Sequence, residues 1–153
     1  SIGMRFFYNR DDAADFCQEV FLKTFDKINS YREIAPFRYW LFKLSYNHAI
    51  NIKKSRPDPV ISSDYEDIQS EARPPEKTHF YNEIKKVLTD EINRLPERYR
   101  ICLDFYFFSG LKYNEISEIT GFPVNTIKSD VLRAKNILRQ KLKGTIAEDY
   151  DEM

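Results

Sequence analysis

A cluster of basic side chains near the C-terminus is the strongest chemical signal in this sequence. Residues 121–143 carry six lysines and arginines against one acid, Asp130, in a chain whose 24 basic and 24 acidic residues cancel overall. Ammonium and guanidinium groups bind phosphate oxygens and donate to guanine edges. The segment therefore indicates either nucleic-acid binding or, on charge alone, an ordinary solvated helix face. The six cations are Lys128, Arg133, Lys135, Arg139, Lys141 and Lys143.

Two predicted helices, 113–120 and 125–142, would position these cations. Gly121 separates them, and either Asn125 or Thr126 has a side chain able to cap the second helix. A short helix, a glycine turn and a longer helix with a basic outer face are typical of a helix-turn-helix, whose second helix enters the DNA major groove. The second helix is also predicted to have a buried stripe of Ile127, Val131, Ala134, Leu138 and Leu142.

The outer face of the second helix offers several kinds of contact to DNA. Lys128 and Arg133 suit phosphates or guanine edges, Ser129 is indifferent to sequence, and Leu132 could meet a thymine methyl or serve only in packing. Asp130 could accept from a cytosine amine or form an ion pair with a neighbouring cation on the helix surface. The predicted contact set is Asn125, Thr126, Lys128, Ser129, Asp130 and Arg133.

A second candidate surface lies on the helix predicted for residues 36–54, which is apolar on two sides. Its remaining strip combines one aromatic side chain, two amides and two cations. That mixture suits single-stranded nucleic acid, because bases stack on aromatic rings, amides bind base edges and lysines bind phosphates. Trp40 could instead be a core residue with one edge exposed. The strip consists of Trp40, Lys43, Asn47, Asn51 and Lys54.

The helix predicted for residues 11–28 has an acidic outer face with an apolar residue at its centre. Leu22 is placed like a protein-interface anchor inside a polar rim, although a single exposed leucine is also ordinary on any protein. The outer face consists of Asp15, Gln18, Glu19, Leu22 and Asp26. The predicted inner stripe consists of Ala13, Phe16, Cys17, Val20, Phe21, Thr24 and Ile28.

Catalysis and cofactors have little support in the sequence. It shows no nucleophile with a paired base, no glycine-rich phosphate loop and no carboxylate pair with a plausible cleft, so we expect no enzyme and no cofactor. His48 falls on an apolar stripe and is predicted to be a core histidine, which together with His79 cannot build a metal site. Cys17 and Cys102 lack metal-ligand spacing, which predicts reduced core thiols in a cytoplasmic protein without membrane insertion.

Composition predicts an all-α protein made of two small helical domains. Only four glycines occur among 153 residues, and no run of alternating β-branched residues is present. An acidic segment with four prolines is predicted to be a linker. The opening SIGMRFFYNR is typical of the end of an amphipathic helix, so we expect an N-terminally truncated first domain. The predicted parts are a first domain (1–56), the linker (57–78), a helix-turn-helix domain (79–144) with further helices at 80–94 and 96–108, and an acidic tail (145–153).

Three segments, in this order, resemble the extracytoplasmic-function (ECF) branch of the sigma-70 family of bacterial transcription initiation factors. DAADFCQEVFLKTF is similar to the family's core-polymerase-binding helix, and FRYWLFKLSYNHAIN to its promoter-melting helix. LPERYRICLDFYFFSGLKYNEISEITGFPVNTIKSDVLRAK is similar to its region 4. The resemblance implies a sigma factor that binds core RNA polymerase, −35 duplex and melted −10 DNA.

The resemblance also implies a role for each surface. The acidic face would bind the β′ clamp, region 4 would bind the −35 element and the β flap, and an anti-sigma factor would cover one or both faces. Phe37 and Asn47 fall where the family captures a flipped −10 base, whose unstacking costs a few kcal/mol. Asp130 replaces a usually basic residue, and Tyr46 and His48 replace smaller or aliphatic ones, so the base preferences stay open. With the strip described above, the predicted −10 set is Phe37, Trp40, Lys43, Asn47, Asn51 and Lys54.

Two other functions remain open from the residues alone. A conventional helix-turn-helix regulator would act without polymerase, but it leaves Leu22 and the strip around Trp40 unexplained. A nucleic-acid-processing enzyme would need paired carboxylates or metal ligands, which the sequence does not offer. The sigma-factor hypothesis accounts for all three surfaces.

Overall fold

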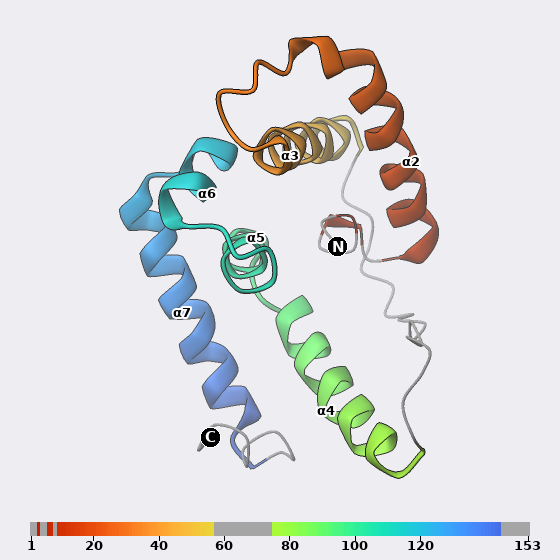
Figure 1. Ribbon diagram of the computed structural model, residues 1–153. Coiled ribbons are helices and arrows are strands. Elements are labelled where there is room, and N and C mark those ends of the chain that lie inside the picture. The colour runs from red at the N-terminus through yellow and green to blue at the C-terminus, as the bar shows by residue number, and fades with distance from the viewer. Residues whose placement is uncertain (1–2, 4–5, 8, 57–74, 145–153) are drawn as a thin grey trace.

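The computed structural model of the chain describes residues 3, 6–7, 9–56 and 75–144 (Figure 1). These residues form six α-helices and no strand, so the all-α prediction is confirmed. A 3₁₀ turn (Ile28–Ser30) follows the first of them, and a π-helical turn (Asp104–Phe108) continues the fourth. The helices are α2 (Arg10–Lys27), α3 (Phe37–Ser55), α4 (Pro75–Asn93), α5 (Glu97–Leu103), α6 (Tyr113–Thr120) and α7 (Val124–Leu142).

Local sequence signals set the helix ends. The Asn9 side chain caps α2 by accepting a hydrogen bond of 2.7 Å from the Asp12 N–H. α7 starts at Val124 after Pro123, whose carbonyl accepts from the Ile127 N–H at 3.0 Å. The prediction that Asn125 or Thr126 caps α7 is therefore wrong, because both already lie inside the helix.

The turn between α6 and α7 depends on one glycine. Gly121 has a φ of 79°, in the left-handed region, and its N–H donates to the Ser117 carbonyl. The Ser117 hydroxyl donates to the Phe122 carbonyl at 2.6 Å, which fixes the other side of the turn. Ile116 and Ile119 are buried as predicted, and the predicted stripe of α7 is buried except for Leu142, which is half-buried.

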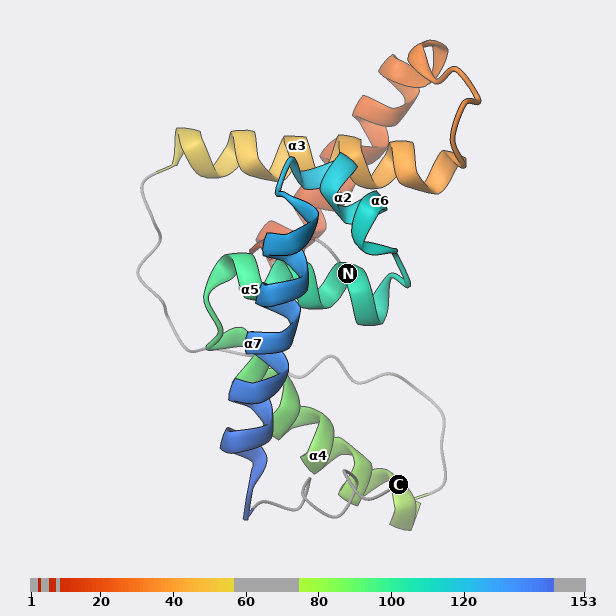
Figure 2. The same cartoon turned by 90° about the vertical axis from the view of Figure 1, so that its left-hand side faces the viewer.

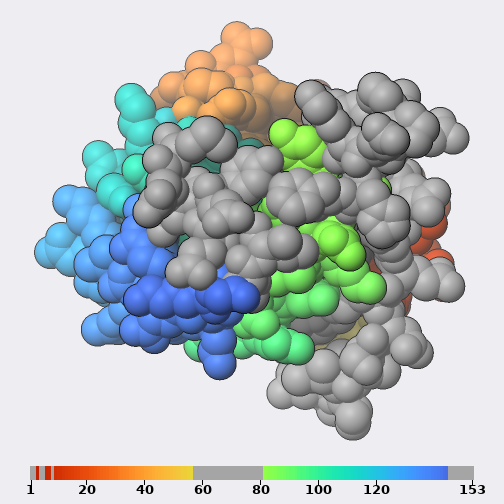
Figure 3. Space-filling model, turned by 90° about the horizontal axis from the view of Figure 1, so that it is seen from below, coloured from red at the N-terminus to blue at the C-terminus, as the bar shows by residue number. Residues whose placement is uncertain are grey.

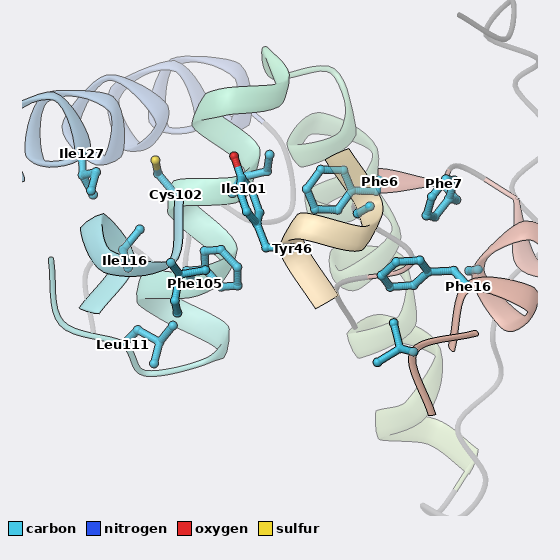
Figure 4. Packing of buried hydrophobic residues seen from close by; sticks show 14 of the residues in the cluster. Phe6, Phe7, Phe16, Tyr46, Ile101, Cys102, Phe105, Leu111, Ile116 and Ile127 are labelled. Carbon is cyan, nitrogen blue, oxygen red and sulfur yellow. The ribbon is translucent and has the colours of Figure 1, made fainter. Parts of the chain in front are cut away.

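The main hydrophobic core joins the two halves of the chain. Phe105, in the π-helical turn, is only 1% exposed, and its ring centroid lies 5.9 Å from that of Phe42 and 6.2 Å from that of Tyr46. Figure 4 shows Phe105 between Leu111 and Ile116 on one side and Tyr46 on the other. Because Phe42 and Tyr46 belong to α3, the N-terminal and C-terminal helices share one interior.

A smaller core lies where α4 and α7 pack side by side, as seen from below in Figure 3. It is built from Ile92, Leu95, Leu103, Ala134 and Leu138. α4 begins at Pro75, so the last residues of the expected linker are helical, while 57–74 and the expected acidic tail lie outside the described residues. The domain boundaries stay a prediction.

Some predictions of burial are wrong. Phe21 is 67% exposed and Ile28 is 42% exposed, although the periodicity of α2 put both on its inner stripe. The reason is that, among the described residues, α2 packs mainly against α3 and Phe7, and its C-terminal half projects beyond them (Figure 1). Cys17 is half-buried rather than a core residue, whereas Cys102 is fully buried as predicted. None of the described helices combines the length and apolar character that a membrane span requires.

Candidate nucleic-acid and polymerase interfaces

The exposed charged side chains of α7 are all cations. Its only acid, Asp130, has no exposed surface and points into the protein. The five cations of the helix are exposed, and Asn125 and Ser129 are exposed beside them near the N-terminal end. Thr126 is half-buried. The exposed cations are Lys128, Arg133, Lys135, Arg139 and Lys141.

Asp130 pairs with a cation from another helix. Arg98 of α5 places its Nε 2.6 Å from Asp130 Oδ2 and donates from Nη2 to Oδ1 at 3.1 Å. The hydrogen bond and the charge of Asp130 raise the pKa of Arg98 above its usual value. Asp130 therefore ties the N-terminal half of α7 to α5. The prediction that Asp130 contacts DNA is wrong for this conformation, because a fully buried carboxylate cannot reach a base.

The ion pair between α5 and α7 leads to a first testable prediction. Asp130→Arg alone would bury a cation beside Arg98, and we expect it to destabilise the fold by about 3–5 kcal/mol. The exchanged pair, Arg98→Asp with Asp130→Arg, restores opposite charges and should recover most of that loss in urea denaturation. A double variant as unstable as the single one would mean that the two side chains do not act as a pair.

Aromatic rings contact two of the exposed lysines of α7. Lys128 Nζ lies 5.9 Å from the ring centroid of Tyr113, which stacks on Tyr106 at 4.7 Å and 3°. Lys135 Nζ lies 5.8 Å from the exposed ring of Phe107. Such contacts hold an ammonium group close to the surface while leaving donors for a ligand.

The predicted strip on α3 is present and mostly exposed. Lys43, Asn47, Asn51 and Lys54 are exposed, and Trp40 is half-buried. All five belong to α3, which Figure 2 shows as one continuous helix. The predicted role of His48 as a core histidine fits its place, since its ring stacks on Phe16 at 5.6 Å and its side chain is 11% exposed.

Three aromatic rings cluster where α3 begins. The centroid of Phe37 lies 5.4 Å from that of Tyr31 and 5.5 Å from that of Trp40, and Tyr31 and Trp40 are 5.8 Å apart. Phe37 is 40% exposed. A cavity of about 260 Å³ adjoins the cluster and is lined by Tyr31, Trp40 and Lys43 together with Glu118 of α6. Exposed aromatic edges beside amides and a lysine form a platform on which an unpaired base can stack.

The outer face of α2 is more apolar than the sequence pattern indicated. Leu22 is 66% exposed as predicted, and Phe21 and Phe25 are exposed by 67% and 75% beside it. Asp15 and Gln18 are also exposed. Glu19 is exposed but accepts a 2.6 Å contact from His48 Nε2, which links α2 to α3. An apolar centre with a polar rim is typical of a protein-binding surface.

Sequence reasoning missed three residues that shape these surfaces. Arg98 was not singled out, because its partner Asp130 lies 32 positions away. Glu115 and Glu118 of α6 reach the α3 strip only because α6 packs on α3. No spacing signal in a single sequence predicts such distant pairs.

Metal and thiol chemistry have no candidate site in the described part of the chain. No group of three or more histidine, cysteine, aspartate or glutamate side chains there could hold a metal ion. Burial, with a smaller contribution from Asp130, raises the pKa of Cys102 to about 12. This thiol therefore stays protonated and unreactive at neutral pH.

Both halves of the chain match one protein family. The family model for sigma-70 region 2 matches residues 1–56, and that for sigma-70 region 4 matches residues 85–138. The first match contains α2 and α3, and the second contains α5, α6 and most of α7. The two matches occur in the order that the three sequence motifs indicated.

Similar full-length proteins are sigma factors from several bacteria. The chain is 29% identical over 147 residues to the ECF RNA polymerase sigma-E factor of Haemophilus influenzae, covering 90% of this chain and 78% of that protein. It is 27% identical over 155 residues to the RNA polymerase sigma-H factor of Pseudomonas aeruginosa, covering 95% and 80%. It is 28% identical over 145 residues to the ECF sigma factor SigW of Bacillus subtilis, covering 88% and 78%.

A solved structure has the same fold. The sigma factor RpoE of Bartonella quintana, in a co-crystal with the anti-sigma factor NepR, superposes with a TM-score of 0.65. The superposition covers 93% of this chain and 88% of the other, at 20% sequence identity.

Proposed function

This chain belongs to the ECF branch of the sigma-70 family, and from that premise we propose which of its surfaces binds each promoter element and which binds polymerase. It is an RNA polymerase sigma factor, an initiation factor and not an enzyme, and its partners are core polymerase and promoter DNA. We infer that it acts in the cytoplasm, where bacterial polymerase and DNA are found. The remaining question is which residues make each contact.

The −35 element is assigned to the outer face of α7. The observation that supports this most is that every exposed charge on the helix is positive, because the carboxylate of Asp130 points inward. Lys128 and Arg133 would bind phosphates or guanine edges, and Asn125 and Ser129 would approach the DNA at the N-terminal end of the helix. Thr126 belongs to the same end, and Asp130 orients the helix instead of contacting bases.

Lys128→Ala is expected to weaken −35 duplex binding about equally for all sequences. The reason is the loss of one phosphate contact, which should also reduce the slope of log K against log salt by about one. Fluorescence anisotropy between about 50 and 200 mM salt measures that slope. Gln140→Ala, an exposed change at the far end of α7, is the control. An unchanged slope in Lys128→Ala would remove this lysine from the phosphate contacts.

The −10 element is assigned to the exposed strip of α3. The ring cluster that includes Phe37 and Trp40 offers a stacking platform, and Asn47 offers donors and acceptors for a base edge. Lys43 and Lys54 would hold the strand by its phosphates, and Asn51 lies between Asn47 and Lys54 on the same face. The strip thereby fits a melted single strand better than a duplex.

Core polymerase is assigned to the outer face of α2. Leu22 lies at its centre, and Asp15, Gln18 and Glu19 form the polar rim. The exposed Phe21 and Phe25 enlarge the apolar area beyond the sequence prediction. Region 4 would make the second contact, at the β flap.

An anti-sigma factor is the proposed inhibitor. The similar RpoE was solved as a complex with its anti-sigma factor NepR, which supports the same type of partner here. The apolar face of α2 and the cationic face of α7 are the surfaces that such a protein would cover.

Binding of the labelled chain to bacterial core RNA polymerase is the direct test of these assignments. Submicromolar binding would support them. A folded chain that binds duplex DNA but not polymerase would favour the conventional helix-turn-helix regulator.

A further inference from the structure

A histidine of α3 contacts a carboxylate on the outer face of α2. His48 Nε2 lies 2.6 Å from Glu19 Oε2, although the two residues are 29 positions apart in the sequence. An ionised carboxylate can only accept hydrogen bonds, so the imidazole donates through its Nε2–H. The contact therefore joins α3, to which the −10 surface is assigned, with the face of α2 that is assigned to core polymerase.

Packing holds the imidazole in one orientation. The His48 ring is stacked on Phe16, with 5.6 Å between the ring centroids and 13° between the planes. Phe16 is only 3% exposed, and its ring packs in turn against Phe7 at 5.2 Å (Figure 4). Because the His48 side chain is only 11% exposed, it cannot change rotamer without disturbing this aromatic stack. The donor that faces Glu19 is thus fixed by the interior of the protein.

Glu19 itself stays open to a partner. Its side chain is 49% exposed despite the contact with His48. The contact uses Oε2, so Oε1 can still accept a hydrogen bond from outside. Glu19 follows Asp15 by four positions and precedes Leu22 by three, which places the three side chains on one face of α2. A carboxylate that is held on one side and open on the other lies next to the proposed anchor, Leu22.

We propose that His48 is a positioning residue for the polymerase interface, which holds the Glu19 carboxylate where it can accept from a cationic side chain of core polymerase. The inference rests on the proposed function, which assigns the outer face of α2 to polymerase. A free glutamate side chain samples several rotamers and loses that freedom when a partner binds it. His48 imposes the order before binding, so less entropy is lost in the complex.

Two substitutions of His48 separate its donor from its bulk. His48→Leu keeps an apolar side chain against Phe16 but has no donor for Glu19. His48→Gln places an amide N–H where the imidazole N–H was. We expect His48→Leu to bind core polymerase about fivefold more weakly than the wild type, and His48→Gln to stay within about twofold of it. Anisotropy of the labelled chain measures both affinities, and circular dichroism checks the folds.

A double-mutant cycle with Glu19→Ala tests whether His48 acts through Glu19. Once the carboxylate is removed, His48→Leu should have no further effect on polymerase binding. Glu83→Ala is the matched control, because Glu83 is an exposed carboxylate of α4, and in that background the fivefold loss should remain.

Two results of this cycle would overturn the role of His48. An equal loss with and without the Glu19 carboxylate would mean that His48 only supports the packing of α2 on α3. Tighter binding by His48→Leu would mean that the imidazole competes with polymerase for Glu19.

Urea denaturation of the four chains of the cycle tests the pair without polymerase. The two substitutions should be less than additive in the free energy of unfolding, because each removes the same contact. Strictly additive losses would show that His48 does not hold Glu19. A wild-type chain that shows this coupling in urea but does not bind polymerase would instead overturn the polymerase assignment of α2, and thus the proposed function.

Discussion

Leu22→Asp is expected to weaken binding to core RNA polymerase by at least a hundredfold while leaving the helical fold intact. Leu22 is 66% exposed between Phe21 and Phe25, so a carboxylate there disturbs no interior packing. In the complex, however, the change removes an apolar anchor and buries a charge without a partner, and central anchors of interfaces contribute about 2–4 kcal/mol. Anisotropy with labelled protein measures the loss.

The matched control for this change is Leu132→Asp. Leu132 is 58% exposed on the face of α7 that we assign to the −35 element, so the same substitution should leave polymerase binding near the wild-type value. Circular dichroism of both variants checks that they fold. Normal polymerase binding by a folded Leu22→Asp chain would show that α2 is not the anchor face.

Phe105→Ala is expected to lower the free energy of unfolding by about 3–5 kcal/mol, because it empties the centre of the core. Phe105 is 1% exposed and contacts the rings of Phe42 and Tyr46 on α3. Domains of this size have only about 5–15 kcal/mol of stability, so the variant should be partly unfolded at modest urea concentrations. Urea denaturation followed by circular dichroism measures the change.

Phe108→Ala is the control from the same π-helical turn. Phe108 is 60% exposed, so its removal should cost less than about 1 kcal/mol. Equal losses in the two variants would mean that the turn itself, and not the contact with α3, accounts for the effect.

Periodicity and turn chemistry were sufficient to predict the helices and the helix-turn-helix. The stripe from Ile127 to Leu138 and the break at Gly121 are local sequence signals. A structure predicted from such signals agrees with the folded protein when the element is well packed. The error at Phe21 has a physical cause. Periodicity gives the face of a helix on which a side chain lies, but not whether another element covers that face.

The remaining features depend on contacts between distant residues. Asp130 appeared to belong to the DNA-facing surface because its partner Arg98 lies on another helix. The contact between Tyr39 and Glu115 joins helices that the sequence assigns to separate domains. Such pairs are fixed by tertiary packing, which a single sequence does not encode in its spacing.

The shared core also affects how the chain folds during synthesis. Phe42 and Tyr46 are synthesised about 60 residues before Phe105, their partner in the core. Translation of that stretch takes several seconds at a typical rate of about 5–20 residues per second. Throughout that interval α3 is complete while its inner rings have no C-terminal partner. Until the second half emerges, the N-terminal half therefore lacks the side chain that closes its core at Phe42 and Tyr46.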